Sequence, residues 1–396
     1  MDFNAELQRC LLPLGEAYSL PAHTYTDESF FYWEKRSSFE EQWFCLGLAK
    51  EIPNCGDYVL KDIYDHKLIL LRDEQQQLRA YSRICRHRAM DMAACPTLAK
   101  KNSKSDISAD KGNIEKITCP FHRWSYEINN GQLNHTPHAQ LSTQHKKSSL
   151  PEYRLHEWQG FVFININGQA GAFSTQLQAL EKQLSQADIS RYAIHQSSAK
   201  TSNQGNWKLA MEIAMESYHH IGAHFNSFQK ISRASSTYVD HGNQRYAALI
   251  NPYCKNIDRS HGPIKLDLFP PSSIEQHYQG FVYYALFPNL LIGTMGGFFD
   301  INIIYPTDKD SHRVEAFLLV PEGEDDNPDI ETIFQQFNII EQEDQALMQA
   351  WIKGLTSAQA PQGPLTKLEK ANWLFYQYLL SSLVVNKNTN SRMQEA

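Results

Sequence analysis

The sequence lacks any uninterrupted apolar run that approaches the roughly 18 residues needed to span a membrane. Its first segment, Met1–Leu20, has no basic stretch followed by an apolar one, so we expect no secretory signal. Basic residues are also in the minority, because 37 Lys and Arg stand against 44 Asp and Glu and give a net charge of −7. This balance argues against a nucleic acid or an anionic membrane as partner. We therefore expect a cytoplasmic protein.

The seven cysteines do not form a recognisable disulfide framework, because they are odd in number and widely spaced. In a long chain without a secretory signal, such cysteines are more typical of thiolate metal ligands than of disulfide bonds. The chain has 396 residues, of which 42% are apolar and 20% charged, which is ordinary for a folded protein. This length predicts two domains.

Short strand-like segments separated by turn residues follow the first 40 residues, for example at 58–60, 67–71 and 160–166. They predict an all-β domain over residues 41–166. Within it, residues 98–113 are polar and aperiodic, which predicts an exposed loop insertion. We interpret residues 1–40 as an N-terminal arm that packs on the second domain.

The second domain, residues 167–396, mixes helical and strand patterns. Helices are predicted at 172–190, 206–224, 330–355 and 365–385, and strands at 281–292, 298–305 and 313–320. The whole chain is therefore predicted to be α+β, with an all-β domain followed by a domain built on a central antiparallel sheet.

Two pairs of metal-ligating residues lie in the predicted all-β domain. Cys85 and His87 form the first pair, and Cys119 and His122 form the second. Each pair mixes one Cys with one His, whereas zinc sites usually pair Cys with Cys and His with His. The pattern resembles the signature of Rieske [2Fe-2S] domains, in which two thiolates hold one iron and two imidazoles hold the other. A structural zinc site is the alternative.

A second group of ligands lies in the predicted helix 206–224, where Glu216, His219, His220 and His224 occur together. In a straight helix Glu216, His220 and His224 share one face, since they are four residues apart. His219 and His224 lie about 140° apart, so using both requires the helix to break, and Gly222 is a plausible place. Helix geometry alone thus leaves His219 and His220 as alternatives.

Asp344 lies in the middle of an apolar stripe on the predicted helix 330–355. The apolar residues fall within about 60° on either side of it at 100° per residue. These residues are Phe337, Ile340, Leu347, Met348, Trp351 and Leu355. A carboxylate in such a stripe is expensive unless a cation neutralises it, so Asp344 is a candidate metal ligand. A buried Asp–Arg pair is the alternative interpretation, and Glu341 is the reserve candidate.

Taken together, the motifs resemble the α (large) subunits of Rieske non-haem iron oxygenases, the ring-hydroxylating oxygenase family. The second motif matches from Asn206-Trp207-Lys208 through an acid three places before a His to a second His five places later. The resemblance implies that Cys85, His87, Cys119 and His122 hold a [2Fe-2S] cluster and that His219, His224 and Asp344 hold mononuclear Fe(II). It also implies a helix-grip (START-like) fold for the second domain.

The resemblance further implies a homotrimer in which Glu216 connects His219 to His122 of the partner subunit. Such an enzyme uses O₂ and receives electrons from a separate NAD(P)H-dependent flavin/iron–sulfur reductase. Two positions depart from the family pattern, because Ala89 and Arg123 stand where the family usually has Gly. An Arg there adds positive charge near the cluster, which is expected to stabilise its reduced form.

The segment 281–305 resembles the pocket strands of the choline, carnitine and glycine-betaine monooxygenases. Tyr283, Tyr284, Phe298 and Phe299 offer ring faces for a quaternary ammonium group, although strand alternation lets only some of them face inward. The resemblance therefore implies hydroxylation, oxidative N-demethylation or cleavage of a small substrate of this kind. An aromatic acid that is hydroxylated or O-demethylated is the alternative.

Overall fold

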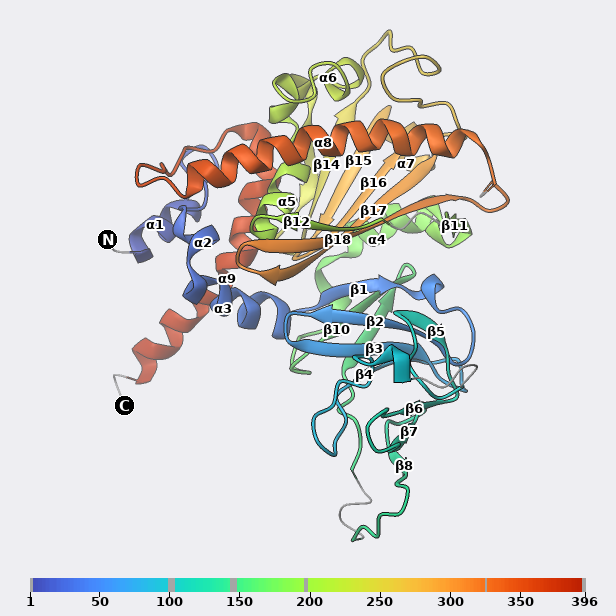
Figure 1. The fold of residues 1–396 in the computed structure, drawn as a ribbon. Helices are drawn as coiled ribbons and strands as arrows, with labels where there is room; N and C mark the ends of the chain where they lie inside the picture. Colours follow the sequence, from blue (N-terminus) through green and yellow to red (C-terminus); the bar gives the residue numbers. More distant parts are fainter. Residues whose placement is uncertain (1–2, 99–103, 143–147, 196–198, 325, 394–396) are drawn as a thin grey trace. The chain divides into compact units, whose positions relative to one another are not determined.

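The computed structural model describes residues 3–98, 104–142, 148–195, 199–324 and 326–393. The chain divides into two compact units, which are coloured along the sequence in Figure 1. The small unit is Glu40–Gly171, and the large unit combines Met1–Phe39 with Ala172–Ala396. Within the described ranges, no helix is both long and apolar enough to cross a membrane.

The small unit contains three antiparallel sheets, in the orders β1-β10-β9, β4-β3-β2-β5 and β6-β7-β8. Its strands are β1 (Phe44–Leu48), β2 (Asp57–Ile63), β3 (His66–Arg72), β4 (Leu78–Ser82), β5 (Lys111–Asn113), β6 (Lys116–Thr118), β7 (Ser125–Glu127), β8 (Leu133–His135), β9 (Arg154–Trp158) and β10 (Phe161–Asn165). Its described residues also form the 3-10 turns η2 (Ala49–Glu51) and η3 (Pro96–Leu98). The predicted all-β character of this region is confirmed.

The loop insertion predicted at 98–113 is partly wrong. Lys111–Asn113 forms strand β5, which pairs with Asp57–Val59 of β2, and Asp106 forms a bridge with Thr118. Backbone pairing rather than hydrophobic alternation holds these residues, since all three residues of β5 are exposed, and the pattern therefore gave no strand signal. Residues 99–103 of the predicted loop lie outside the described residues.

The large unit is built on an eight-stranded antiparallel sheet of order β11-β18-β17-β16-β15-β14-β13, with β12 also paired to β18. These strands are β11 (Tyr192–Ile194), β12 (Ala199–Gln204), β13 (Tyr238–Gly242), β14 (Tyr246–Pro252), β15 (Gly280–Leu286), β16 (Leu290–Met295), β17 (Phe298–Asp308) and β18 (Ser311–Pro321). The predicted α+β class with a central antiparallel sheet is confirmed.

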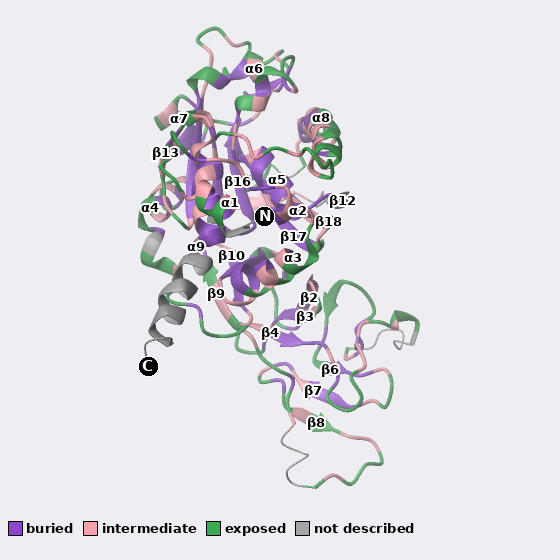
Figure 2. Cartoon of the chain, turned by 90° about the vertical axis from the view of Figure 1, so that its left-hand side faces the viewer, coloured by how far each residue is buried: buried purple, intermediate pink, exposed green. Residues whose placement is uncertain are grey.

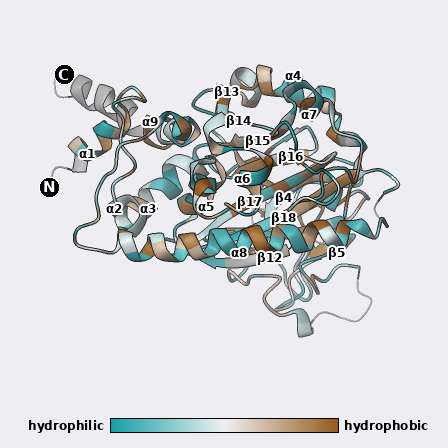
Figure 3. Ribbon diagram, turned by 90° about the horizontal axis from the view of Figure 1, so that it is seen from above, coloured by the Kyte–Doolittle hydropathy of each residue, from teal (hydrophilic) through white to brown (hydrophobic). Residues whose placement is uncertain are grey.

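Nine α-helices have been assigned in the described parts of the large unit: α1 (Phe3–Cys10), α2 (His23–Thr26), α3 (Glu28–Glu34), α4 (Gln178–Ala187), α5 (Trp207–Ala214), α6 (Phe228–Ile231), α7 (Ser273–Tyr278), α8 (Asp329–Leu355) and α9 (Lys370–Met393). Shorter helical turns are η1 (Lys35–Glu40), η5 (Phe173–Gln176), η6 (Ile189–Arg191), η7 (Tyr218–Ile221), η8 (Ala234–Ser236) and η9 (Lys367–Glu369). Helix α8 lies across the sheet, and Figure 3 shows hydrophobic and hydrophilic residues alternating along it.

Side-chain alternation on strand β15 separates the two faces of the sheet. Phe281 and Tyr283 point to a cavity that α8 also lines, whereas the Tyr284 hydroxyl donates to Gln183 on α4 at 2.9 Å. The sheet strands are mostly buried in Figure 2, while α8 is intermediate to exposed. The face below α8 is therefore the one that encloses the cavity.

Two predicted elements were too long. The helix predicted at 206–224 ends at Ala214, and a separate 3-10 turn, η7, begins at Tyr218. The chain leaves the helix at 215–217, and η7 in turn ends at Ile221 with Gly222 as its C-cap, so the break predicted at Gly222 is present and an earlier one precedes it. Likewise, the strand predicted at 281–292 is a hairpin of β15 and β16 that turns at Phe287–Asn289. Both strands are apolar because both are buried, and the Pro288-Asn289 pair between them marks the turn.

Helix α5, which leads into the ligand segment, is held by buried polar contacts to the N-terminal helices. The Lys208 ammonium lies 2.8 Å from the Glu34 carboxylate and donates to the Thr24 carbonyl at 2.8 Å. The hydroxyls of Tyr25 and Tyr376 each donate to Glu212 at 2.7 Å. Burial raises the pKa of the Glu212 carboxyl to about 7, although the two hydroxyls oppose that shift.

Candidate functional site

The four predicted cluster ligands lie on two loops with the same backbone arrangement. In the first, the Ala89 amide donates to the Cys85 carbonyl at 3.1 Å and the Cys85 amide to Met90 at 2.8 Å. In the second, the Arg123 amide donates to the Cys119 carbonyl at 3.1 Å and the Cys119 amide to Trp124 at 2.8 Å. Each loop thus presents a Cys and a His from one tight turn.

Both loops place a non-glycine residue in the left-handed region, with φ of 53° at Ala89 and 61° at Arg123. These are the two positions where the sequence departs from the glycines expected by resemblance. Glycine adopts this backbone without steric cost, whereas other residues pay on the order of 1 kcal/mol. Both loops therefore adopt the left-handed backbone conformation that glycine favours, although neither has glycine at that position.

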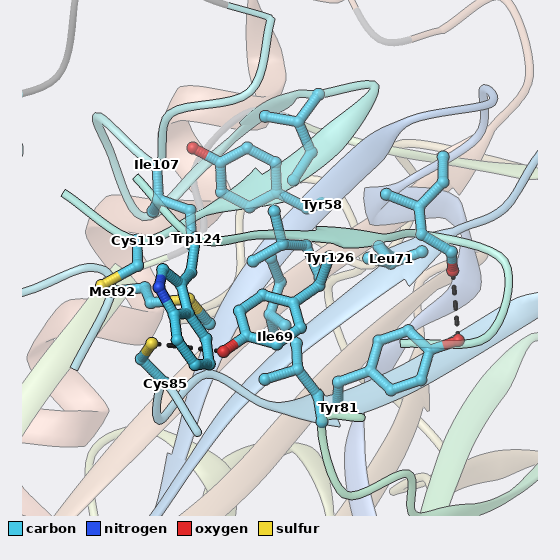
Figure 4. Packing of buried hydrophobic residues seen from close by; sticks show 14 residues of the cluster. Tyr58, Ile69, Leu71, Tyr81, Cys85, Met92, Ile107, Cys119, Trp124 and Tyr126 are labelled. Atoms are coloured by element: carbon cyan, nitrogen blue, oxygen red, sulfur yellow. Dashed lines mark hydrogen bonds between the residues drawn. The ribbon is translucent and has the colours of Figure 1, made fainter. Parts of the chain in front are cut away.

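The two cysteines are buried and the two histidines are exposed. Figure 4 shows Cys85 and Cys119 beside Trp124, with the Tyr126 hydroxyl 3.2 Å from the Cys85 sulfur. A hydrogen bond from Cys119 lowers the pKa of the Cys85 thiol to about 5 and raises that of Cys119. The His87 and His122 rings lie 4.7 Å apart between centroids. Two adjacent thiols and two adjacent imidazoles fit a cluster with one thiolate-bound and one imidazole-bound iron.

Arg123 is paired with a carboxylate. Its Nη2 lies 2.7 Å from Oδ1 of Asp106, a residue that is only 5% exposed. The positive charge beside His122 is thus balanced locally, and Arg123 also ties the 104–118 segment to the ligand loop. This pairing qualifies the expected effect of Arg123 on the cluster, because a compensated charge stabilises the reduced form less than a free one.

In the large unit, Asp344 contacts two of the predicted ligands. Its Oδ1 lies 2.9 Å from Nε2 of His224 and 3.6 Å from Nε2 of His219. The opposite nitrogens are held by other carboxylates: Nδ1 of His219 pairs with Glu216 at 2.7 Å, and Nδ1 of His224 pairs with Glu343 at 2.7 Å. Carboxylates on the far side of metal-binding imidazoles orient the rings and make them more basic.

Both Nε2 atoms therefore face the Asp344 carboxylate. Nε2 of His219 is buried and has no hydrogen-bond partner among the described residues. Asp344 keeps a quarter of its side chain accessible, so it is less buried than its place in the apolar stripe predicted. Its partners are imidazoles and not an Arg, and the donor set of two imidazoles and one carboxylate fits Fe(II) with open coordination positions.

His220, the alternative to His219, lies in a different environment. Ligand atoms of His219, His220 and His224 lie within 4.8 Å of one another, so all three belong to the cluster. The His220 ring stacks on Phe228 at 5.1 Å between centroids, and burial lowers its pKa well below the ordinary value. The geometry favours His219 as the ligand, because the break before η7 turns its Nε2 toward Asp344.

A cavity of about 370 Å³ opens beside this cluster, between α5, α8 and the sheet. It is mostly apolar, and its aromatic residues are Phe228, Phe281, Tyr283, Phe317, Phe334 and Phe337. Of the four aromatic residues proposed from the sequence, Tyr283 lines the cavity. Tyr284 faces α4, Phe299 packs edge-on against Tyr192, and Phe298 lies in the hydrophobic core, so these three do not line the cavity, in keeping with the expectation that only some of the four face inward.

Sequence reasoning missed Asp300, Glu343 and the aromatic residues of α6 and α8. Glu343 gave no signal because it lies off the apolar stripe, but the two nitrogens of His224 reach two adjacent residues of α8. Asp300 was missed because a polar residue in a strand ordinarily indicates the solvent face. The signal for Asp300 was its place in the run from 298 to 304, which is apolar except for Asp300 and Asn302.

Two protein families match the chain. The Rieske [2Fe-2S] domain matches residues 42–153, and the ring hydroxylating alpha subunit (catalytic domain) matches residues 187–383. The carnitine monooxygenase oxygenase subunit of Escherichia coli (strain K12) is 30% identical over 245 residues, which are 61% of this chain and 61% of that protein. The glycine betaine monooxygenase oxygenase subunit of Chromohalobacter salexigens is 29% identical over 210 residues, which are 52% of this chain and 43% of that protein.

The chain therefore matches about three fifths of the first relative's length and less than half of the second's. Among solved structures, a quaternary ammonium Rieske monooxygenase superposes with a TM-score of 0.77 at 20% identity. That superposition covers 95% of this chain and 98% of the other. At this identity the structural likeness establishes the fold.

Proposed function

The chain belongs to the Rieske non-haem iron oxygenase α subunits, and from this premise we propose that it is the oxygenase component of a mono- or dioxygenase system. It uses O₂ and electrons from a separate NAD(P)H-dependent flavin/iron–sulfur reductase to hydroxylate, oxidatively N-demethylate or cleave a small organic substrate. One observation carries the proposal: the same chain contains a ligand set for the cluster and a ligand set for the mononuclear iron. Within each set, the side chains lie close to one another.

Each ligand set has a defined role in this proposal. Cys85, His87, Cys119 and His122 hold the [2Fe-2S] cluster, and His219, His224 and Asp344 hold mononuclear Fe(II). When bound, the cluster supplies single electrons and the mononuclear iron activates O₂. Glu216 and Glu343 orient the two imidazoles from their Nδ1 atoms, and the apolar cavity wall excludes water from the bound substrate.

We also propose that the chain works as a homotrimer, in which Glu216 connects His219 to His122 of the partner subunit. Two surface features support such contact. His122 and its neighbour Phe121 are exposed, with Phe121 at 55%. Around Glu216, three large apolar side chains are exposed as well, namely Tyr218, Ile221 and Phe225 at 45%, 50% and 60%. Clustered exposed apolar residues are typical of protein interfaces.

The substrate that we propose is a quaternary ammonium compound. The two relatives are named for carnitine and glycine betaine, and the cavity offers ring faces at Phe281 and Tyr283 for a cationic head group. An aromatic acid is the alternative, since the same rings accept a planar molecule. We propose that residues 41–166 form the domain that holds the cluster and that residues 167–396 form the domain that holds the mononuclear iron. We also propose a cytoplasmic location.

Metal content and turnover test the proposal. Purified protein is expected to be reddish-brown and to contain about three Fe per chain, two in the cluster and one mononuclear. A panel of quaternary amines, aromatic acids and N- or O-methyl compounds is then assayed with reductase for O₂ consumption and product mass. A colourless protein that binds zinc, or two iron-free sites, overturns the oxygenase assignment.

The bridge role of Glu216 has its own test. Glu216→Gln is expected to keep both metals bound, since Glu216 is not a ligand, while NADH oxidation proceeds with little product. The carboxylate that pairs with His219 Nδ1 at 2.7 Å becomes a neutral amide, which weakens the connection between the centres. Iron analysis and the ratio of product to NADH measure this. Normal coupling in the variant rejects the bridge.

A further inference from the structure

Two carboxylates in the cavity belong to neither ligand set. Asp300 lies on β17, and Glu341 lies on α8 one turn before Asp344. Both line the cavity, which is also lined by Glu216 and Asp344 of the iron site. Among the described residues that line it, none is Lys or Arg. The cavity therefore carries an excess of negative charge beyond what the iron ligands account for.

Only neutral groups hold these two carboxylates in place. The Asn302 amide donates to Asp300 at 2.9 Å, and the Gln345 amide donates to Glu341 at 3.1 Å. No ion pair involves either residue in the part of the chain that the structure describes. Amide donors fix the direction of a carboxylate without cancelling its charge. Each carboxylate is thus oriented and still lacks a cation.

An aromatic ring lies next to Asp300. In the sheet register Tyr283 is opposite Gly293, and Gly293 is opposite Asp300, so the three residues lie in a row across β15, β16 and β17. A Cβ atom on Gly293 would be only 2.8 Å from the Tyr283 ring. The ring therefore lies over the glycine on the side of Asp300. Gly293 is what allows an aromatic face and a carboxylate to adjoin on one wall.

Ionising the Asp300 carboxyl is unfavourable unless a cation lies beside it. Burial raises the pKa of its carboxyl to about 7, the Asn302 amide opposes this, and the nearby Glu341 adds to it. A buried carboxylate is stable when a cation compensates it. A ring face beside a carboxylate is a favourable site for an organic cation, because the two attractions act on the same charge.

We infer that Tyr283, Asp300 and Glu341 form a cation subsite, and that the substrate is an ammonium compound without a carboxylate of its own. This inference rests on the proposed oxygenase function and narrows its substrate class. Carnitine and glycine betaine are zwitterions, so with their ammonium group in this subsite their carboxylate lies only a few bonds from Asp300 and Glu341, with no Lys or Arg among the described lining residues to receive it. An aromatic acid meets the same repulsion. The cavity thus selects against the substrates for which the two relatives are named.

Matched ligands test the charge requirement on the iron-loaded oxygenase. Choline and glycine betaine share the trimethylammonium group and differ in a hydroxymethyl group against a carboxylate. A third ligand, 3,3-dimethylbutan-1-ol, has the shape of choline without its charge. Calorimetric dissociation constants are expected to favour choline at least tenfold over both. Equal or tighter binding of glycine betaine, or failure of choline to bind, overturns the inference.

Variants of Asp300 and Glu341 test whether these two carboxylates cause the preference for choline over glycine betaine. Asp300→Asn is expected to reduce the preference of choline over glycine betaine at least tenfold, and Glu341→Gln to reduce it less. Glu331→Gln serves as the matched control, because Glu331 is an exposed carboxylate on the same helix that does not line the cavity. A preference that Asp300→Asn leaves unchanged overturns the inference.

Metal analysis and turnover separate this inference from the proposed function. Iron content in Asp300→Asn is expected to equal that of the parent chain, and loss of metal would show that the carboxylates serve a metal ion, which overturns the inference. Oxygen-dependent conversion of a zwitterion or an aromatic acid, with no conversion of cations, rejects the cation subsite and leaves the oxygenase function intact. Absence of iron in both sites rejects the oxygenase function itself.

Discussion

Asp300 is the residue whose protonation state is expected to matter most for substrate affinity. Its carboxyl is protonated below and charged above a pKa of about 7, because burial and the neighbouring Glu341 outweigh the Asn302 amide. Tyr283 on β15 also faces it, and the pKa of that hydroxyl is raised well above its ordinary value. Only the charged form of Asp300 attracts a cation.

Affinity for choline is therefore predicted to rise by about tenfold between pH 6 and pH 8, since the competent fraction rises by that factor around a pKa of about 7. Calorimetry across this range measures it. The neutral isostere 3,3-dimethylbutan-1-ol is the control and is expected to bind with a flat profile, as is choline to Asp300→Asn. A flat profile for choline with the parent chain contradicts the prediction.

The ion pair of Arg123 and Asp106 makes a second prediction at the residue scale. Removing either partner leaves the other charge uncompensated beside the cluster ligand His122, so the two single variants are expected to have opposite effects. Asp106→Asn is expected to raise the reduction potential, and Arg123→Gly to lower it. Shifts on the order of tens of mV are expected, since about 59 mV corresponds to about 1.4 kcal/mol for one electron.

Redox titration of the cluster spectrum measures these shifts. The double variant Arg123→Gly with Asp106→Asn removes both charges, and its potential is expected to lie near that of the parent chain. Ala89→Gly provides a control, because it changes the other left-handed position without changing charge. Shifts of the same sign in both single variants would indicate a structural disturbance in place of an electrostatic effect.

The role of a site residue was predictable from the sequence where the residue lies within a regular helix or strand. Asp344 emerged from helical periodicity because α8 is a regular helix over 27 residues. His219 and His220 stayed unresolved because the answer depends on where a helix breaks, and the break at 215–217 carries neither Gly nor Pro. Asp300 became recognisable only when the sheet register placed it beside Tyr283.

At the scale of elements, helix α5 depends on its anchor to the N-terminal helices. Lys208 and Glu34 are both fully buried and pair at 2.8 Å, which connects α5 to α3. Lys208→Met leaves the Glu34 carboxylate buried without its cation. We predict a loss of stability on the order of 3 to 5 kcal/mol, the usual cost of breaking a buried pair. Urea-induced unfolding measures it.

The double variant Lys208→Met with Glu34→Gln is the control for this anchor, because it removes both charges together. It is expected to recover part of the lost stability, since replacing a buried pair costs less than breaking it. Equal destabilisation by the single and double variants would show that packing and not charge dominates at this contact.

Elements were predicted well where amphipathic pattern and length agreed, as for α8, β17 and β18. The prediction was poor for the hairpin of β15 and β16, because both strands are apolar and only the Pro288-Asn289 pair signals the turn between them. The exposed strand β5 was missed for the opposite reason, since only backbone pairing to β2 reveals it. The paired backbone groups of a short edge strand leave no trace in side-chain hydrophobicity.

At the scale of the whole molecule, the proposed trimer places the electron donor and the iron that receives the electron in different chains. This separation can be tested by mixing two inactive variants. Cys85→Ser lacks the cluster and keeps the iron site, whereas His219→Ala lacks the iron site and keeps the cluster. Neither is expected to turn over alone, because each lacks one centre in every subunit.

Co-expression of the two variants with different tags is predicted to give mixed trimers with about a third of the parent activity per subunit. In a head-to-tail ring that contains both variants, only one subunit of each trimer keeps the iron and has the neighbour that keeps the cluster. Turnover of purified mixed trimers with reductase measures this. Co-expression of two differently tagged Cys85→Ser chains is the control and stays inactive. No recovery in mixed trimers would place electron transfer within a single chain and reject the role of Glu216 as an intersubunit bridge.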